Sequence, residues 1–186
     1  MVEQRLALAR GGTEMLKHIC RASSGDDLEG FVLDIGDAWV LVASLSDSIY
    51  IDGFVVFPIA DVVEVEDRVD ELTFVRRALT LQRMWPPARP AVRLDLDDTA
   101  TMFRAIAASA PVVTLFTERV DDDVCFVGVP MNPGGASIHL REIRYDASWC
   151  PEPSEWPYAD ITRIEFGDRY SAIIYAVASE SEPAAN

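Results

Sequence analysis

Short apolar segments separated by small polar residues recur along the chain and predict a mostly β fold. In the first half, the predicted strands cover residues 30–35, 38–45, 49–51, 54–59, 62–66 and 73–81. Asp52-Gly53 predicts a tight turn between two of them, because this pair readily adopts the positive φ that hairpin turns need. In the second half, the predicted strands cover residues 112–117, 124–129, 138–145, 159–166 and 170–177.

Two segments have apolar residues three and four positions apart, which predicts helices. The first starts near the N-terminus, where Leu6, Leu8 and Ala9 precede a break or bend at Gly11-Gly12, and continues with an apolar stripe at Met15, Leu16, Ile19 and Cys20. The second follows the acidic residues 97–98, which favour a helix N-terminus, and has its stripe at Met102, Phe103, Ile106 and Ala107. Pro111 ends this second helix.

A proline-rich segment at residues 84–90 predicts a linker, because prolines so close together continue neither a helix nor a central strand. The sequence therefore predicts a first helix-plus-strands unit over residues 1–84 and a linker over 85–92. A second unit follows over residues 93–178, and a polar tail over 179–186.

The two halves show the same order of predicted elements, a helix and then about five strands. Residues 15–19 align with 102–106, and residues 37–42 align with 123–128. The best match joins residues 60–66 to 159–165, where three of seven positions are identical, including Asp61 and Asp160. This pattern favours an internal duplication, although small β-rich domains also share such spacing by chance.

A helix followed by five short, bent strands resembles the Sm-like small β-barrel, and this resemblance covers most of each half. Sm-type RNA binders carry an aspartate and then Met-Asn in the turn after the second strand. The second half has Met131-Asn132 near that turn but Gly128 in the place of the aspartate, and the first half has Ser46-Asp47-Ser48 there. The resemblance therefore implies two tandem Sm-like barrel units.

The basic Ile-Arg-Gly motif that Sm-type proteins carry near the fourth strand is also missing, and Ala-Asp-Val and Ala-Asp-Ile stand in that stretch. The resemblance thus implies a shared fold without the RNA-binding residues. The whole chain also resembles a group of uncharacterised bacterial proteins with paired Gly-Phe-Val and Trp-Val-Leu-Val strands, here residues 30–32 and 39–42. That second resemblance assigns no activity.

The formal net charge of −15 is spread over both halves and changes which partners are expected. Such a surface repels phosphate backbones and anionic membranes, and it favours basic protein partners. No apolar run approaches the roughly 18 residues that span a bilayer, and the N-terminus has no signal-peptide pattern. We therefore expect a cytoplasmic protein that binds neither nucleic acid nor membrane.

The residues that could carry chemistry form no recognisable motif. Cys20, Cys125 and Cys150 are odd in number and far apart, which predicts free thiols. His18 and His139 do not suggest a metal site, and no cofactor motif is present. Asp121-Asp122-Asp123 could attract a cation, but it is more typical of a solvated turn. The sequence thus predicts no catalytic residue, metal or cofactor.

Two sets of residues remain candidates for a functional site. The repeated Asp61 and Asp160 either form equivalent sites or accept backbone N–H bonds that stabilise a turn. Trp149 and Trp156 lie in a long loop, residues 148–156, which we interpret as an interaction loop because tryptophan often anchors interfaces. The alternative is a loop that folds back, so that both rings cover the chain's own apolar surface.

Three functions are compatible with these features. The first is a non-enzymatic protein-binding or scaffolding module, with a protein partner or self-association. The second is an inhibitor such as an immunity protein against a basic toxin, because acidic surfaces speed association with basic partners. The third is an enzyme of unidentified type that uses Asp61, Asp160 or His139.

Overall fold

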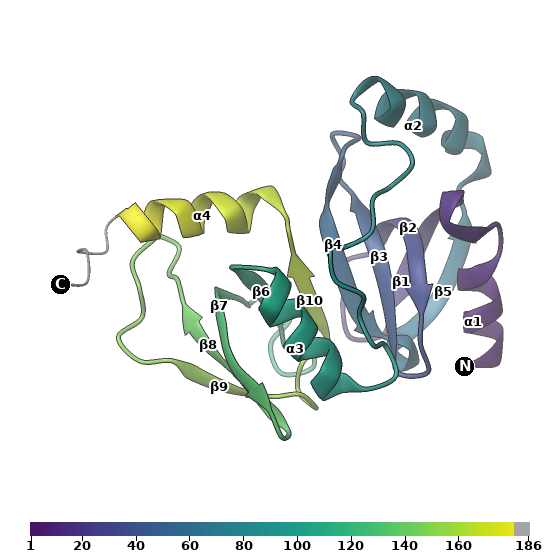
Figure 1. The fold of residues 1–186 in the computed structure, drawn as a ribbon. Helices are drawn as coiled ribbons and strands as arrows, with labels where there is room; N and C mark the ends of the chain where they lie inside the picture. Colours follow the sequence, from purple (N-terminus) through teal and green to yellow (C-terminus); the bar gives the residue numbers. More distant parts are fainter. Residues whose placement is uncertain (181–186) are drawn as a thin grey trace.

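The computed structural model describes residues 1–180, which form one antiparallel sheet of ten strands with four α-helices (Figure 1). The strand order across the sheet is β5-β1-β2-β3-β4-β10-β6-β7-β8-β9. The prediction of a mostly β, α+β fold is therefore confirmed, with four helices where the sequence predicted two.

The first half contains two α-helices, two 3₁₀ turns and five strands. In chain order these are α1 (Val2–Ala9), η1 (Gly12–Glu14), β1 (Leu16–Arg21), β2 (Leu28–Ile35), β3 (Trp39–Leu45), β4 (Ile51–Pro58), η2 (Ile59–Asp61), β5 (Val62–Asp67) and α2 (Val69–Leu81). Its strands lie in the order β5-β1-β2-β3-β4.

The second half has the same succession of helix, five strands and helix. In chain order these are α3 (Thr99–Ser109), β6 (Val113–Phe116), β7 (Cys125–Gly134), β8 (Ser137–Glu142), β9 (Ser154–Pro157), β10 (Arg163–Phe166) and α4 (Arg169–Glu180). Its strands lie in the order β10-β6-β7-β8-β9, so the last strand of each half lies beside the first strand of that half. Helix α4 includes residues 179–180 of the predicted tail, and residues 181–186 lie outside the described residues.

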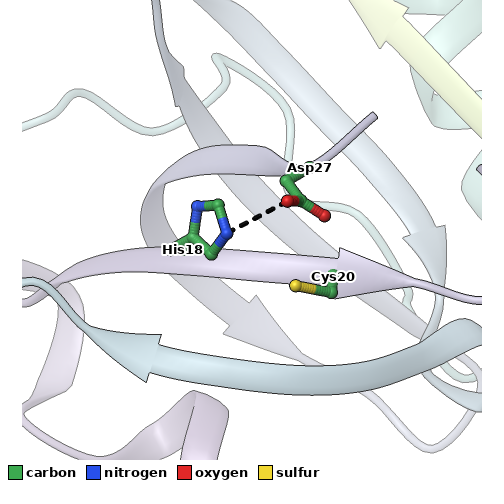
Figure 2. A group of neighbouring side chains, drawn as sticks. All are labelled: His18, Cys20 and Asp27. Atoms are coloured by element: carbon green, nitrogen blue, oxygen red, sulfur yellow. Dashed lines mark ion pairs between the residues drawn. The ribbon is translucent and has the colours of Figure 1, made fainter. Parts of the chain in front are cut away.

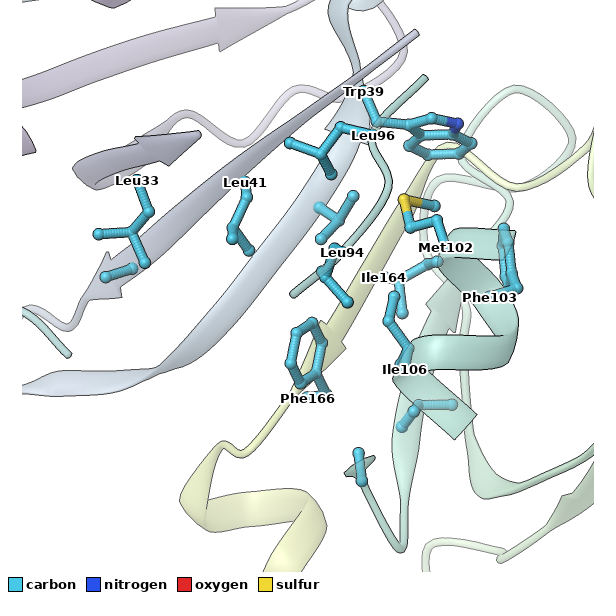
Figure 3. Packing of buried hydrophobic residues seen from close by; sticks show 14 of the residues in the cluster. Leu33, Trp39, Leu41, Leu94, Leu96, Met102, Phe103, Ile106, Ile164 and Phe166 are labelled. Atoms are coloured by element: carbon cyan, nitrogen blue, oxygen red, sulfur yellow. The ribbon is translucent and has the colours of Figure 1, made fainter. Parts of the chain in front are cut away.

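The two halves share one hydrophobic core (Figure 3). Leu94 and Leu96, which follow the predicted linker, pack there with Leu33 and Leu41 of the first half. Helix α3 and strand β10 complete this part of the core with Met102, Phe103, Ile106, Ile164 and Phe166. The proline-rich segment is thus followed closely by chain that is buried between the halves.

The helix predicted at residues 15–20 is wrong, because this segment is strand β1 between β5 and β2. Its alternate residues Lys17, Ile19 and Arg21 are buried, and two of these three carry a positive charge. The alternation of buried and partly exposed residues along this strand is therefore not visible in the pattern of hydrophobic residues. The alignment of residues 15–19 with 102–106 is wrong as well, since the first segment is a strand and the second lies in α3. The alignment of residues 37–42 with 123–128 is also wrong, because it joins β3, the third strand of its half, to β7, the second strand of the other half.

The strands predicted at residues 73–81 and 170–177 are also wrong, because these segments belong to helices α2 and α4. The buried residues of α2 are Val75 and Leu79, four positions apart. Ile174 and Ala178 have the same spacing in α4. β-branched and aromatic residues around these pairs favoured a strand, but burial follows the helical period.

The hairpin predicted at Asp52-Gly53 is absent, since both residues lie within strand β4. Gly53 has a φ of +72°, and a Cβ atom there would lie 2.6 Å from the carbonyl oxygen of Phe166. The glycine therefore allows β10 to approach β4 closely, rather than reversing the chain.

None of the described helices is both long and apolar enough to cross a membrane, and the longest, α2, has 13 residues.

Candidate functional site

The sheet ends in two strands that each have a neighbour on one side only, β5 and β9. An edge strand directs alternate backbone N–H and C=O groups away from its neighbour, where another strand can pair with them. Helix α1 contacts both β5 and β2, and Lys17 Nζ of β1 donates to the carbonyl oxygen of Ala7 at 2.9 Å, so α1 packs on side chains of these strands rather than pairing as a strand with β5. Val63, Glu64 and Glu66 of β5 are exposed, and Val63 keeps 61% of its surface in solvent.

Strand β9 at the other edge was not predicted, and it contains one of the two tryptophans assigned to the interaction loop. Trp156 is half-buried, with its ring 4.1 Å from the ring of Phe126. Its indole Nε1 donates a hydrogen bond of 2.9 Å to Ser154 Oγ within the same strand. The side chain of Trp156 thus makes contacts within its own chain that stabilise edge strand β9.

Trp149 packs in a different place, against helix α4. Its ring meets the Tyr175 ring edge-on at 6.3 Å, and its Nε1 donates to the carbonyl oxygen of Ala178 at 3.1 Å. The guanidinium of Arg141 lies 4.0 Å from the centre of the indole ring. At Trp149 the loop therefore folds back on its own chain, as the alternative interpretation states, and a role of either tryptophan in binding stays a prediction.

Strands β4 and β10 join the two halves in the middle of the sheet. Val56 lies opposite Ile164, Val55 opposite Glu165 and Phe54 opposite Phe166. The last pair also brings its two rings to 5.3 Å.

A buried cluster of charges lies beside this junction and also connects the halves. Arg21 of β1 donates two hydrogen bonds, of 2.8 and 2.6 Å, to the two carboxylate oxygens of Glu118. Arg163 Nη2 lies 3.3 Å from Glu118 Oε1, and Thr162 Oγ1 donates to Oε2 at 2.8 Å. Burial alone would raise the pKa of Glu118, but the hydrogen bond from Arg21 and the charge of Arg163 outweigh it and hold the pKa below its usual value.

The repeated aspartates have different environments. Asp61 is buried, accepts a hydrogen bond of 3.1 Å from the Ser23 backbone N–H, bonds the Ser23 hydroxyl and lies 3.6 Å from Arg21. Asp160 is exposed in the turn after β9. Arg21 connects Asp61 to Glu118 of the second half, so the two aspartates that the sequence match aligns have different surroundings.

The other predicted residues stay apart. His139 is half-buried on β8, opposite Glu155 of β9. Within residues 1–180, no hydrogen bond or ion pair joins any two of Asp61, Asp160 and His139. Asp121-Asp122-Asp123 is an exposed turn in which Asp121 Oδ1 accepts from the Asp123 backbone N–H at 3.1 Å.

The three cysteines are free thiols. Cys125 is exposed, whereas Cys20 and Cys150 are half-buried. Desolvation, followed by the hydrogen bond to Asp27, raises the pKa of the Cys20 thiol. Glu64 and Glu66 raise the same pKa further through their negative charge, so Cys20 lies in an acidic environment.

Comparison with known proteins adds no relative: no family model, no curated protein and no solved structure matches this chain.

Proposed function

We propose that this chain is a non-enzymatic protein-binding scaffold of two duplicated Sm-like units, and that copies of it join end to end through edge strands β9 and β5. The observation that carries the proposal is the pairing of β4 with β10 inside the chain. The same pairing between two copies would use β9 and β5.

The correspondence of strands supports the duplication. In the sheet, β9 has the place in the second half that β4 has in the first, and β10 has the place of β5. The sequence match at an offset of 99 residues extends back to the ends of β4 and β9. Phe57-Pro58-Ile59-Ala60-Asp61-Val62 aligns there with Trp156-Pro157-Tyr158-Ala159-Asp160-Ile161. The internal junction thus joins the fourth strand of one unit to the fifth strand of the other.

The internal register can be transferred to the junction between copies. At the junction between copies, the pair Val56–Ile164 corresponds to Glu155 of one copy opposite Val65 of the next. In the same way, the pair Val55–Glu165 corresponds to Ser154 of one copy opposite Glu66 of the next. Neither pair brings two like charges directly opposite each other, which would destabilise the pairing. Because β9 and β5 are different surfaces, the contact is head-to-tail, and repeated contacts close a ring or extend a chain.

The chemistry of the surface favours a protein partner over RNA. The residues that Sm-type proteins use for RNA are missing, and the net charge is −15. The same charge supports a second proposal, an inhibitor of a basic protein, which would bind as a monomer without the β9–β5 contact.

Light scattering after size-exclusion chromatography tests the scaffold proposal. We expect the molar mass to rise above the 20.6 kDa of one chain as the concentration increases. Val63→Lys places a charge on the β5 edge and should lower the mass, because charged edges resist pairing. Leu81→Lys, at a residue 86% exposed in α2, is the matched control and should leave assembly unchanged. A mass of 20.6 kDa at every concentration would contradict the proposal.

A further inference from the structure

His18 and Cys20 of strand β1 lie together with Asp27, which is in the turn between β1 and β2 (Figure 2). His18 and Cys20 are two positions apart on β1, so both side chains leave the same face of the sheet. Asp27 approaches from the turn, with its Oδ2 atom 3.2 Å from His18 Nε2. One ligand atom from each residue lies within 4.8 Å of the other two.

We propose that His18, Cys20 and Asp27 bind one Zn²⁺ ion. Imidazole nitrogen, thiolate sulfur and carboxylate oxygen are the three ligand types that zinc takes in proteins. Bonds of about 2.0–2.3 Å in tetrahedral geometry place neighbouring ligand atoms about 3.3–3.8 Å apart. The separations in the cluster therefore need only small side-chain movements to hold the ion, and water would take the fourth position.

The surroundings of His18 match a zinc ligand and its support. Its Nδ1 atom is buried without a hydrogen-bond partner, and Glu29 Oε1 lies 3.6 Å away. When Nε2 binds a metal, the other ring nitrogen donates its proton to a carboxylate or carbonyl, which orients the ring. Glu29 is the carboxylate for this role, and Arg68 Nη2, 3.4 Å from the same oxygen, restrains its position.

Two further carboxylates raise the attraction for a cation. Strand β5 places Glu66 opposite His18 and Glu64 opposite Cys20, and both glutamates are exposed. His18 and Cys20 are half-buried, but the Asp27 side chain is 46% exposed, so solvent reaches the site on the side of Asp27. The thiol ligand favours zinc over magnesium or calcium, which prefer oxygen ligands. A bound ion would tie the β1–β2 turn to β1.

Spectroscopy and calorimetry on the untagged, metal-free chain test the site. Co²⁺ alone should produce a thiolate-to-metal charge-transfer band at one ion per chain, and Zn²⁺ should abolish the band by displacing cobalt. Cys20→Ser should remove the band, while Cys150→Ser and His139→Gln, at the other half-buried cysteine and the other histidine, should retain it. Glu29→Gln should weaken Zn²⁺ binding about tenfold, because it removes only the orienting carboxylate.

Thermal unfolding without metal checks that each variant is folded. The absence of a charge-transfer band in the wild-type chain, or a band that survives Cys20→Ser, would overturn the proposal. Calorimetry in which His18→Gln binds Zn²⁺ as tightly as the wild-type chain would overturn it as well.

Discussion

Arg21 and Glu118 form a two-pronged salt bridge, at 2.8 and 2.6 Å, across the boundary between the two halves of the chain. The side chains are 0% and 2% exposed, and the residues are 97 positions apart in sequence. A buried ion pair becomes costly when one partner is removed, because the other charge is left without compensation in a medium of low polarity. The two halves should therefore depend on this contact for their stability.

Glu118→Gln should lower the free energy of unfolding by about 3 kcal/mol, because it removes the carboxylate that Arg21 and Arg163 share and leaves them only the more distant Asp61 and Glu165. Urea denaturation measures this loss. Asp37→Asn is the control, since Asp37 pairs with Arg5 at the surface and its side chain is 81% exposed. The control should cost less than about 1 kcal/mol. Equal losses in the two variants would contradict a special role for the buried pair.

The pH dependence of stability should reflect the lowered pKa of Glu118. Its carboxyl group has a lower pKa in the folded chain than in the unfolded chain, so its stabilising contribution is present above the unfolded value of about 4.3 and is lost as pH falls through the folded value. The difference in unfolding free energy between the wild-type chain and Glu118→Gln should therefore shrink on acidification. Denaturation at a series of pH values measures it, and a constant difference would refute the assignment.

Gly53→Ala should destabilise the junction of β4 with β10. The substitution combines a positive φ with a Cβ atom 2.6 Å from both Phe166 O and Asp168 N, and we expect a loss of about 3 kcal/mol. Gly135 also has a positive φ, but no atom lies within 4 Å of its Cβ position, so Gly135→Ala should cost only about 1 kcal/mol. Thermal unfolding compares the two. Similar losses of stability in the two variants would show that the close approach of β10 to β4 does not determine the effect of Gly53→Ala.

Trp149→Ala should act on stability, because the indole ring packs on Tyr175 and bonds the backbone of Ala178. We expect a loss of about 2 kcal/mol for this half-buried ring. Tyr145→Ala, at a residue 92% exposed, is the aromatic control and should change stability by less than about 0.5 kcal/mol. Unchanged stability of Trp149→Ala together with loss of a bound protein would instead support the interaction loop.

The sequence allowed part of the fold to be predicted, where local signals agree with tertiary contacts. Strands β2, β3, β5, β6, β7 and β8 and helix α3 were predicted, and Asp98 caps α3 by accepting from the Thr101 backbone N–H at 2.6 Å. Strand β1 was missed because Lys17 and Arg21 are buried beside Asp67 and Glu118, partners that only the fold brings near. Buried charges of this kind have no local signature.

The candidate sites were also not predicted from the sequence, because they too depend on contacts that only the fold creates. The spacing of His18 and Cys20 on one strand face was visible in the sequence, but the segment was predicted as a helix, where residues two apart point in different directions. The approach of Asp27 depends on the turn between β1 and β2. Edge strand β9 was hidden in a four-residue segment that ends in proline and was assigned to a loop.

Pairing of β9 of one copy with β5 of the next is tested most directly by mixing two variants that each lack one edge. Val63→Lys blocks β5, and Glu155→Pro blocks β9 by removing a backbone donor. Thermal unfolding first establishes that both variants are folded.

Light scattering should then find each variant alone at 20.6 kDa and an equimolar mixture at twice that mass, because the mixture restores one complementary pair of edges. Assembly of either variant alone, or a mixture that stays at 20.6 kDa, would contradict head-to-tail pairing.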